Sequence, residues 1–205
     1  MCRRTALPGA LVVIIQRYGE TDVAGRTSYY DLRSHFTQLG LTTVIWDKPG
    51  CGKSEGKFDA DQPVDRSAGG VLDAIRHLRE SHEASFSRAQ AQFLSGAFQI
   101  DKKTWLQIYV PHFQDMLARL NLPVLAIFGE KDRNVDWRRT TVLYSRTIGE
   151  NPHASLTVRT FPDGNHNLQQ AVTGGLREMI EMKDRRMCDG YFEAMESWLR
   201  TKVPG

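Results

Sequence analysis

The sequence predicts an α/β protein with a mostly parallel sheet flanked by helices. Apolar, β-branched runs of about five residues alternate with stretches of helical periodicity, which is typical of strand–helix–strand units. The run Leu11–Ile15 is continuously apolar, as expected for a strand that helices cover on both faces. A chain of 205 residues with 40% hydrophobic and 25% charged residues suits one globular domain, and we assign it residues 1–205.

The first half of the chain supplies two predicted strands. Leu11–Gln16 is the first, and a loop and an amphipathic helix follow it. Gly40 gives this helix a C-terminal stop, and Thr42–Trp46 is the second buried strand. An apolar stripe at helical spacing then predicts a helix over Val64–Glu80.

The second half repeats the alternation. Val124–Phe128 and Leu156–Phe161 are predicted strands, and the segment between them predicts a helix over Trp137–Ile148. Right-handed crossovers would place helices on both faces of the sheet, with the first-half strands on one side and these two on the other. A terminal helix is marked by apolar residues at helical spacing: Phe192, Met195, Trp198 and Leu199.

Residues 81–121 interrupt this pattern. The interval contains no β-branched run and reads as helical or irregular, with a short helix starting at Pro111. We interpret it as a helix-rich, cap-like insertion, because an alternating fold would continue here with a strand.

Composition excludes several classes of function. The net charge of +3 arises from 27 basic and 24 acidic residues without a basic block, so we expect no nucleic-acid partner. Three scattered cysteines and six histidines fit no metal-ligand spacing, so we expect reduced thiols, no metal and no cofactor. The apolar run near the N-terminus is interrupted by Pro8 and is too short to span a membrane, so we expect a cytoplasmic protein.

The stretch WDKPGCGKSEG, residues 46–56, has three interpretations. A phosphate-binding loop requires glycine at position 47, where Asp47 would repel phosphate instead. Gly52 to Gly56 matches the G-x-S-x-G of a nucleophile elbow, but seven residues separate Ser54 from the predicted strand that ends at Trp46. The third interpretation, a glycine-rich turn that leaves a strand, is the one we favour.

Four segments together resemble α/β-hydrolase-fold enzymes. They are the D-x-P-G-x-G-x-S-x-G turn after the second strand, IIQRYGETD (14–22), LPVLAIFGEKDRNV (122–135) and FPDGNHNL (161–168). The resemblance covers most of the chain and implies Asp132 as the triad acid, His166 as the base and the backbone N–H of Tyr18 as an oxyanion donor. From the residues alone, Asp132 could equally be a turn residue, as could Asp136, and His166 a structural loop histidine.

The sequence departs from this family at the nucleophile. The strand and elbow that should follow the Val64–Glu80 helix are absent, so the fold is α/β-hydrolase-like but shortened. An uncovered sheet edge would favour a homodimer. Three residues remain as nucleophile candidates: Ser54, Ser95 and Cys51.

Two functions follow from this interpretation. The first is a hydrolase of carboxylic esters of small acyl substrates with a Ser/Asp/His-type mechanism and weak activity, because a nucleophile on a loop is not held in attack geometry. The second is a catalytically inactive, shortened relative that retains a binding pocket or only the fold. A phosphate-binding NTPase is a more distant third.

Overall fold

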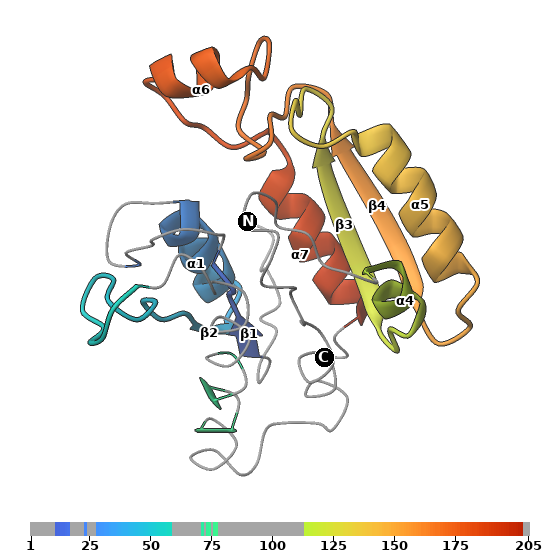
Figure 1. The fold of residues 1–205 in the computed structure, drawn as a ribbon, viewed down its shortest axis with the longest axis horizontal. Coiled ribbons are helices and arrows are strands. Elements are labelled where there is room, and N and C mark those ends of the chain that lie inside the picture. Colours follow the sequence, from blue (N-terminus) through green and yellow to red (C-terminus); the bar gives the residue numbers. More distant parts are fainter. Residues whose placement is uncertain are drawn as a thin grey trace, which may run out of the picture. The chain divides into compact units, whose positions relative to one another are not determined.

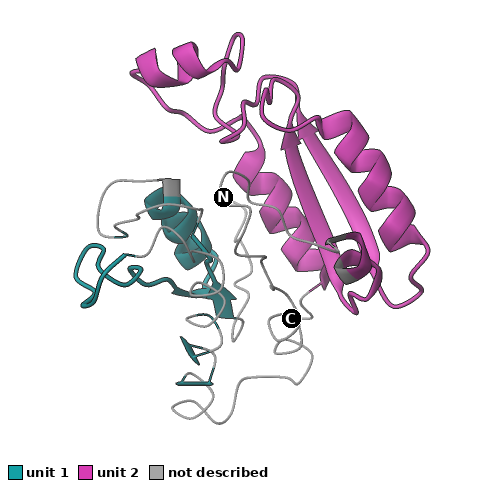
Figure 2. Cartoon of the chain, viewed as in Figure 1, with its two compact units in different colours: residues 1–113, 205 teal, residues 114–204 magenta. Residues whose placement is uncertain are grey.

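The computed structural model describes residues 11–16, 23, 28–58, 71, 73–74, 76–77 and 113–202. The chain divides into two compact units, residues 1–113 with 205 and residues 114–204 (Figure 2). Each unit has one pair of parallel strands together with helices (Figure 1). The described residues therefore have the predicted α/β class, in the form of two small parallel sheets.

In the first unit, the strands are shorter than predicted. β1 spans Leu11–Val13 and β2 spans Thr42–Val44, paired in parallel register. The predictions had extended these strands to Gln16 and Trp46. The side-chain amide of Gln16 donates to the backbone carbonyl of Trp46, so a side-chain contact joins the two segments where the strands have already ended.

Helix α1, Ser28–Gln38, connects these strands and ends at the predicted glycine. Gly40 has φ of 80°, a left-handed conformation that glycine adopts without steric cost. The N–H of Leu41 then donates to the carbonyl of Phe36 at 3.0 Å, which closes the helix end as a Schellman motif. Phe36, Leu39 and Leu41 are all buried, so the helix end also contributes the core of this unit. Within the predicted Val64–Glu80 helix, the structure describes residues 71, 73–74 and 76–77, and all are helical.

The second unit contains α4 (Phe113–Ala118), β3 (Pro123–Gly129), α5 (Trp137–Gly149), β4 (Ser155–Phe161), α6 (Leu176–Glu181) and α7 (Tyr191–Lys202). β3 and β4 pair in parallel over seven residues, from Pro123 opposite Ser155 to Gly129 opposite Phe161. Both strands and the intervening helix agree with the predictions to within one residue at each end, and α7 contains all four residues that marked the terminal helix.

Helices cover both faces of the β3–β4 pair. Neighbouring strand residues point to opposite faces, so Phe128 and Phe161 lie on opposite sides, because Phe161 pairs with Gly129. Phe128 contacts Tyr144 of α5, and Phe161 contacts Tyr191 of α7, each with ring centroids 6.1 Å apart. Figure 1 shows α5 alongside β4 and α7 alongside β3. This two-sided packing explains the continuously apolar run Val124–Phe128 of β3, whereas β4 also carries polar residues, among them the exposed Arg159.

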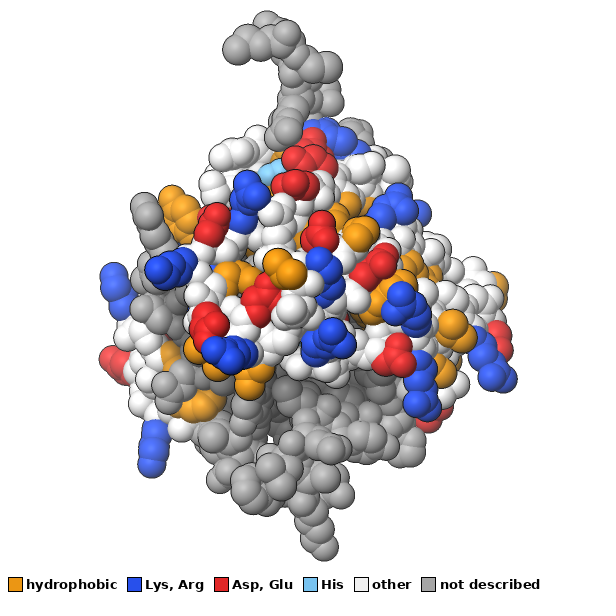
Figure 3. Space-filling view, turned by 90° about the horizontal axis from the view of Figure 1, so that it is seen from above, with side chains coloured by type: hydrophobic (Ala, Val, Ile, Leu, Met, Phe, Trp, Pro, Cys, Tyr) orange, Lys and Arg blue, Asp and Glu red, His pale blue; other side chains and the backbone are white. Residues whose placement is uncertain are grey.

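Some architectural predictions remain open. The single domain over 1–205 and the alignment of all four strands in one sheet stay predictions, because the two units are described separately. Of the predicted insertion over 81–121, the structure describes only the end that contains α4. No helix in the described part of the chain is long and apolar enough to cross a membrane. On the face drawn in Figure 3, side chains of both charges are interspersed.

Candidate active site

The turn after β3 holds Asp132 rigidly. Backbone hydrogen bonds continue beyond the end of β3. The N–H of Glu130 donates to the carbonyl of Phe161, and that of Lys131 donates to the carbonyl of Gly164, both at 2.9 Å. Oδ1 of Asp132 accepts the backbone N–H groups of Asn134 at 2.7 Å and Val135 at 3.0 Å. One carboxylate oxygen of Asp132 is therefore used to fix its own turn, and the other remains for a partner.

His166 is that partner. It follows β4 by five residues, and its Nδ1 lies 2.9 Å from Oδ2 of Asp132. The Asp132 side chain is 7% exposed, whereas the His166 side chain is 42% exposed. An ionised carboxylate can only accept, so the contact favours the tautomer with the proton on Nδ1 and leaves Nε2 as the basic nitrogen. The arrangement has a buried acid behind a solvent-accessible base.

Asp136 has a different role from Asp132, although the sequence left both as possible turn residues. Asp136 is the N-cap of α5, and its side chain accepts the N–H of Arg139 at 3.1 Å. N-cap aspartates satisfy backbone donors at the start of a helix. The carboxylate next to the histidine is thus that of Asp132, while Asp136 starts the following helix.

Two glycines let the acid and histidine loops approach each other. A methyl group at Gly129 would overlap the carbonyl oxygens of Gly164 and Asn165, and one at Gly164 would lie 2.9 Å from Cα of Gly129. No larger residue fits at this crossing without a shift of the backbone. This contact was not predicted from the sequence, although Gly129 lies in LPVLAIFGEKDRNV (122–135) and Gly164 in FPDGNHNL (161–168).

Ser54 lies in a separate loop of the first unit, ten residues after β2 ends. Its hydroxyl donates to the backbone carbonyl of Asp47 at 2.9 Å, and its N–H donates to Cys51 at 2.9 Å. Gly50, Gly52 and Gly56 have φ of 74°, 54° and 97°. Residues 46–58 contain no helix. The described geometry is therefore that of a glycine-rich turn.

The carboxylate of Asp47 is the centre of this loop. Oδ2 accepts the N–H of Lys53 at 2.9 Å, and Oδ1 accepts the N–H of Val23 at 2.7 Å. The hydrogen bond from Lys53, followed by that from Val23, lowers the pKa of Asp47 below its ordinary value. A phosphate loop would direct such N–H groups at its ligand, so Asp47 takes the place that a phosphate would need.

The remaining predicted residues are placed as follows. Cys51 is a buried free thiol, as is Cys188. Ser95 and Tyr18 lie outside the described residues. Among the residues that the structure describes, no group of three or more His, Cys, Asp or Glu side chains could hold a metal ion.

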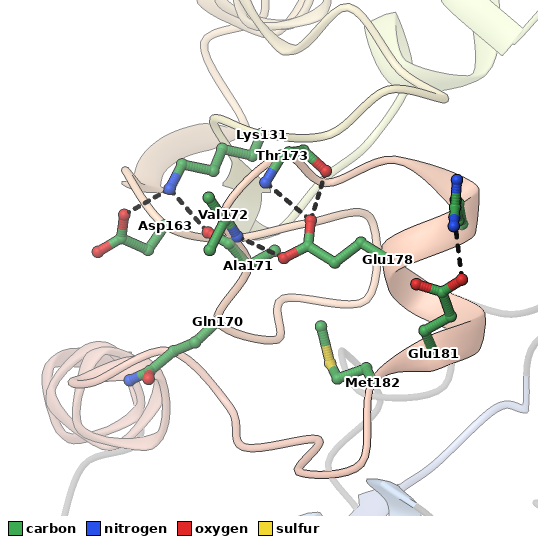
Figure 4. A pocket seen from close by; sticks show the side chains of 10 residues that line it. Lys131, Asp163, Gln170, Ala171, Val172, Thr173, Glu178, Glu181 and Met182 are labelled. Carbon is green, nitrogen blue, oxygen red and sulfur yellow. Dashed lines mark hydrogen bonds and ion pairs between the residues drawn. The ribbon is translucent and has the colours of Figure 1, made fainter.

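A hollow of about 760 Å³ lies in the second unit, beside α6 (Figure 4). Lys131 Nζ donates there to Asp163 at 2.8 Å and to the carbonyl of Ala171 at 2.7 Å. The Glu178 carboxylate accepts the Thr173 hydroxyl and the N–H groups of residues 172–174. These hydrogen bonds lower the pKa of Glu178 to about 2, and the one from the Thr173 hydroxyl has the largest effect. Neither Asp132 nor His166 lines this hollow, so we do not place the reaction in it.

The comparison with known proteins concerns the fold of the chain. No family model and no protein of curated function matches the chain. The solved structure of an esterase from Pyrococcus furiosus is similar, with a TM-score of 0.60, 13% sequence identity, and coverage of 96% of this chain and 83% of that one. At this identity the likeness concerns the fold alone, which is an α/β fold resembling that of an esterase.

Proposed function

We propose that the chain is a hydrolase of the α/β-hydrolase family that acts on carboxylic esters of small acyl substrates. The observation that carries the proposal is the contact of 2.9 Å between Asp132 and His166 at the carboxyl ends of two adjacent parallel strands. Ligands of open α/β sheets bind beyond these strand ends. The similarity of fold to an esterase supports the same class of reaction.

In the proposed mechanism, Nε2 of His166 takes the proton from a hydroxyl or thiol nucleophile as it attacks the ester carbonyl. The same proton passes to the leaving alkoxide when the ester C–O bond breaks, which leaves an acyl-enzyme. His166 then takes a proton from water as the water attacks the acyl-enzyme, and it returns this proton to the nucleophile's oxygen or sulfur when the acyl bond breaks and the acid is released. Asp132 holds the imidazole tautomer and stabilises the imidazolium. The backbone N–H of Tyr18 is proposed to bind the oxyanion.

The nucleophile is assigned to one of three residues: Ser54, Ser95 or Cys51. Ser54 is the first choice because it stands in the G-x-S-x-G sequence. Its hydroxyl would first have to leave the carbonyl of Asp47, because that bond now holds its proton. This requirement and the missing elbow are the reasons why we expect turnover to be slow.

The same hydrogen bond favours the second candidate function, a catalytically inactive relative that keeps the fold and the Asp132–His166 pair. In an active elbow the serine follows a strand directly and starts a helix. Ser54 instead donates within a glycine-rich turn. An inactive protein would be folded and would bind ligands without turnover.

A fluorophosphonate probe and a chromogenic short-chain ester separate these functions. The hydrolase is supported if one serine is labelled and if His166→Ala abolishes the turnover. Ser54→Ala should then remove both labelling and turnover, whereas Ser95→Ala, the matched control, should leave them unchanged. Labelling of Ser95, or activity that only Cys51→Ala removes, would move the nucleophile to that residue. A folded protein that is neither labelled nor active would establish the inactive relative.

A further inference from the structure

Asn165, which directly precedes His166, is completely buried, with 0% exposure. Its side-chain Oδ1 accepts the N–H of Asn167 at 2.8 Å and that of Gln169 at 3.1 Å. Its own N–H donates to the carbonyl of Gln169, and its carbonyl accepts from Leu168, both at 3.0 Å. Four hydrogen bonds of one residue thus close the loop that carries the histidine.

The loop needs this closure because its backbone is strained. Leu168 has φ of 58°, a left-handed conformation that residues with a side chain rarely adopt. The two N–H groups held by the Asn165 side chain lie on either side of Leu168. Strained residues persist only where the surrounding structure holds them. Here the buried Asn165 oxygen does so together with the backbone hydrogen bonds of Leu168 to Asn165 and Cys188.

We infer that Asn165 is a positioning residue for His166, an inference that rests on the proposed function. Asp132 is fixed by its own turn through Asn134 and Val135, so it would not follow the imidazole if the histidine loop relaxed. Asn165 therefore acts on the histidine side of the contact between Nδ1 and Oδ2. Its Nδ2 is buried and has no hydrogen-bond partner among the described residues, so the side chain acts through its oxygen.

Three variants test this assignment. Asn165→Ala removes the accepting oxygen, and Asn165→Asp keeps an oxygen while it replaces the unpartnered Nδ2. Asn167→Ala is the matched control. Asn167 is also an asparagine next to His166, but its side chain is exposed and only its backbone N–H donates to Asn165. The readouts are the NMR signal of the His166 Nδ1–H proton, the pH profile of kcat/KM for a short-chain ester, and folding by circular dichroism.

Asn165→Ala should remain folded, lose the Nδ1–H signal to exchange with water and lower kcat/KM by about 10²-fold, because a small misplacement of a catalytic group has this effect. Asn165→Asp should keep the signal, and Asn167→Ala should match the wild type in every readout. The assignment is overturned if Asn165→Ala keeps the signal, or if a folded Asn165→Asp loses it. It is also overturned if neither Asn165 variant folds, since Asn165 would then serve the fold rather than the histidine.

The NMR signal is measured without substrate, so the two proposals can fail separately. A wild-type protein that shows the signal but hydrolyses no ester contradicts the proposed function and leaves the positioning of His166 by Asn165 intact. An active protein whose signal and pH profile do not respond to Asn165→Ala contradicts the positioning role alone.

Discussion

Asp47 and Asp132 both follow a strand of a parallel pair, and both belong to recognisable motifs, yet their carboxylates are used differently. Asp47 accepts the N–H of Val23 with one oxygen and that of Lys53 with the other, so backbone N–H groups use both oxygens. Asp132 uses one oxygen for its turn and the second for His166. The comparison teaches that a motif aspartate becomes a candidate catalytic group only when backbone N–H groups leave one of its oxygens free.

The largest expected effect separates the two aspartates by activity. Asp132→Asn should lower kcat by up to about 10⁴-fold, because an amide opposite Nδ1 favours the wrong imidazole tautomer. If the wild-type enzyme is slow, a loss of this size lowers its turnover to the uncatalysed rate of ester hydrolysis in buffer. Asp47→Asn should lower kcat much less in the same assay, because its carboxylate accepts two backbone N–H groups and contacts no imidazole. Equal losses in both variants would mean that Asp132 serves only the fold.

The second prediction concerns the crossing that brings the acid and histidine loops together. Gly129→Ala should lower the free energy of unfolding by about 1–3 kcal/mol, because the added methyl overlaps two carbonyl oxygens of the histidine loop. Chemical denaturation measures this change, and the Nδ1–H signal of His166 should weaken with it.

Gly149→Ala is the matched control for that crossing. Gly149 ends α5, and a methyl group there would meet nothing within 4 Å. We expect Gly149→Ala to raise the free energy of unfolding by about 0.4–1 kcal/mol, since alanine reduces the entropy of the unfolded chain. If both glycine variants are equally stable, close approach does not determine the position of the histidine loop.

The third prediction concerns the contribution of the Asp47 carboxylate to stability. Asp47→Asn should lower the melting temperature, because the amide offers only one accepting oxygen to the two N–H groups that the carboxylate now binds. Glu55→Gln removes the same charge from the same loop without touching these donors and should melt like the wild type. A melting temperature that responds equally to both changes would point to net charge rather than to the hydrogen bonds.

The smallest effect concerns Glu178 of α6, a third carboxylate, whose oxygens both accept from the segment that precedes this helix. Its folded pKa of about 2 lies below the ordinary value of 4.5, so its stabilising contribution is present above about pH 4.5 and is lost as pH falls toward 2. Denaturation midpoints across this range should therefore change less in Glu178→Gln than in the wild type. Ile180→Gln, at a residue of the same helix that is 69% exposed, changes no charge and should keep the wild-type dependence. An unchanged dependence in Glu178→Gln would show that these hydrogen bonds do not form in solution.

The sequence was most informative where structure is local. The β3 and β4 strands, the helix between them and the terminal helix follow from apolar periodicity, and Gly40 correctly marked the end of α1. It was less reliable for β1 and β2, whose ends it placed two or three residues too far. Apolar residues continue there, but the strand pairing ends earlier, and periodicity does not report where backbone pairing stops.

The sequence by itself therefore determined the alternation of strands and helices, and the order of the acid and histidine loops. Only the tertiary structure decided that Asp132 meets His166 across 34 residues, and that Asp136 caps a helix instead. It also decided that Asn165, directly before the histidine, is completely buried. These outcomes depend on the register of β3 against β4 and on the close approach of Gly129 to Gly164. Local propensity is set by neighbours along the chain, whereas a site is set by which loop ends a parallel register brings to the same edge.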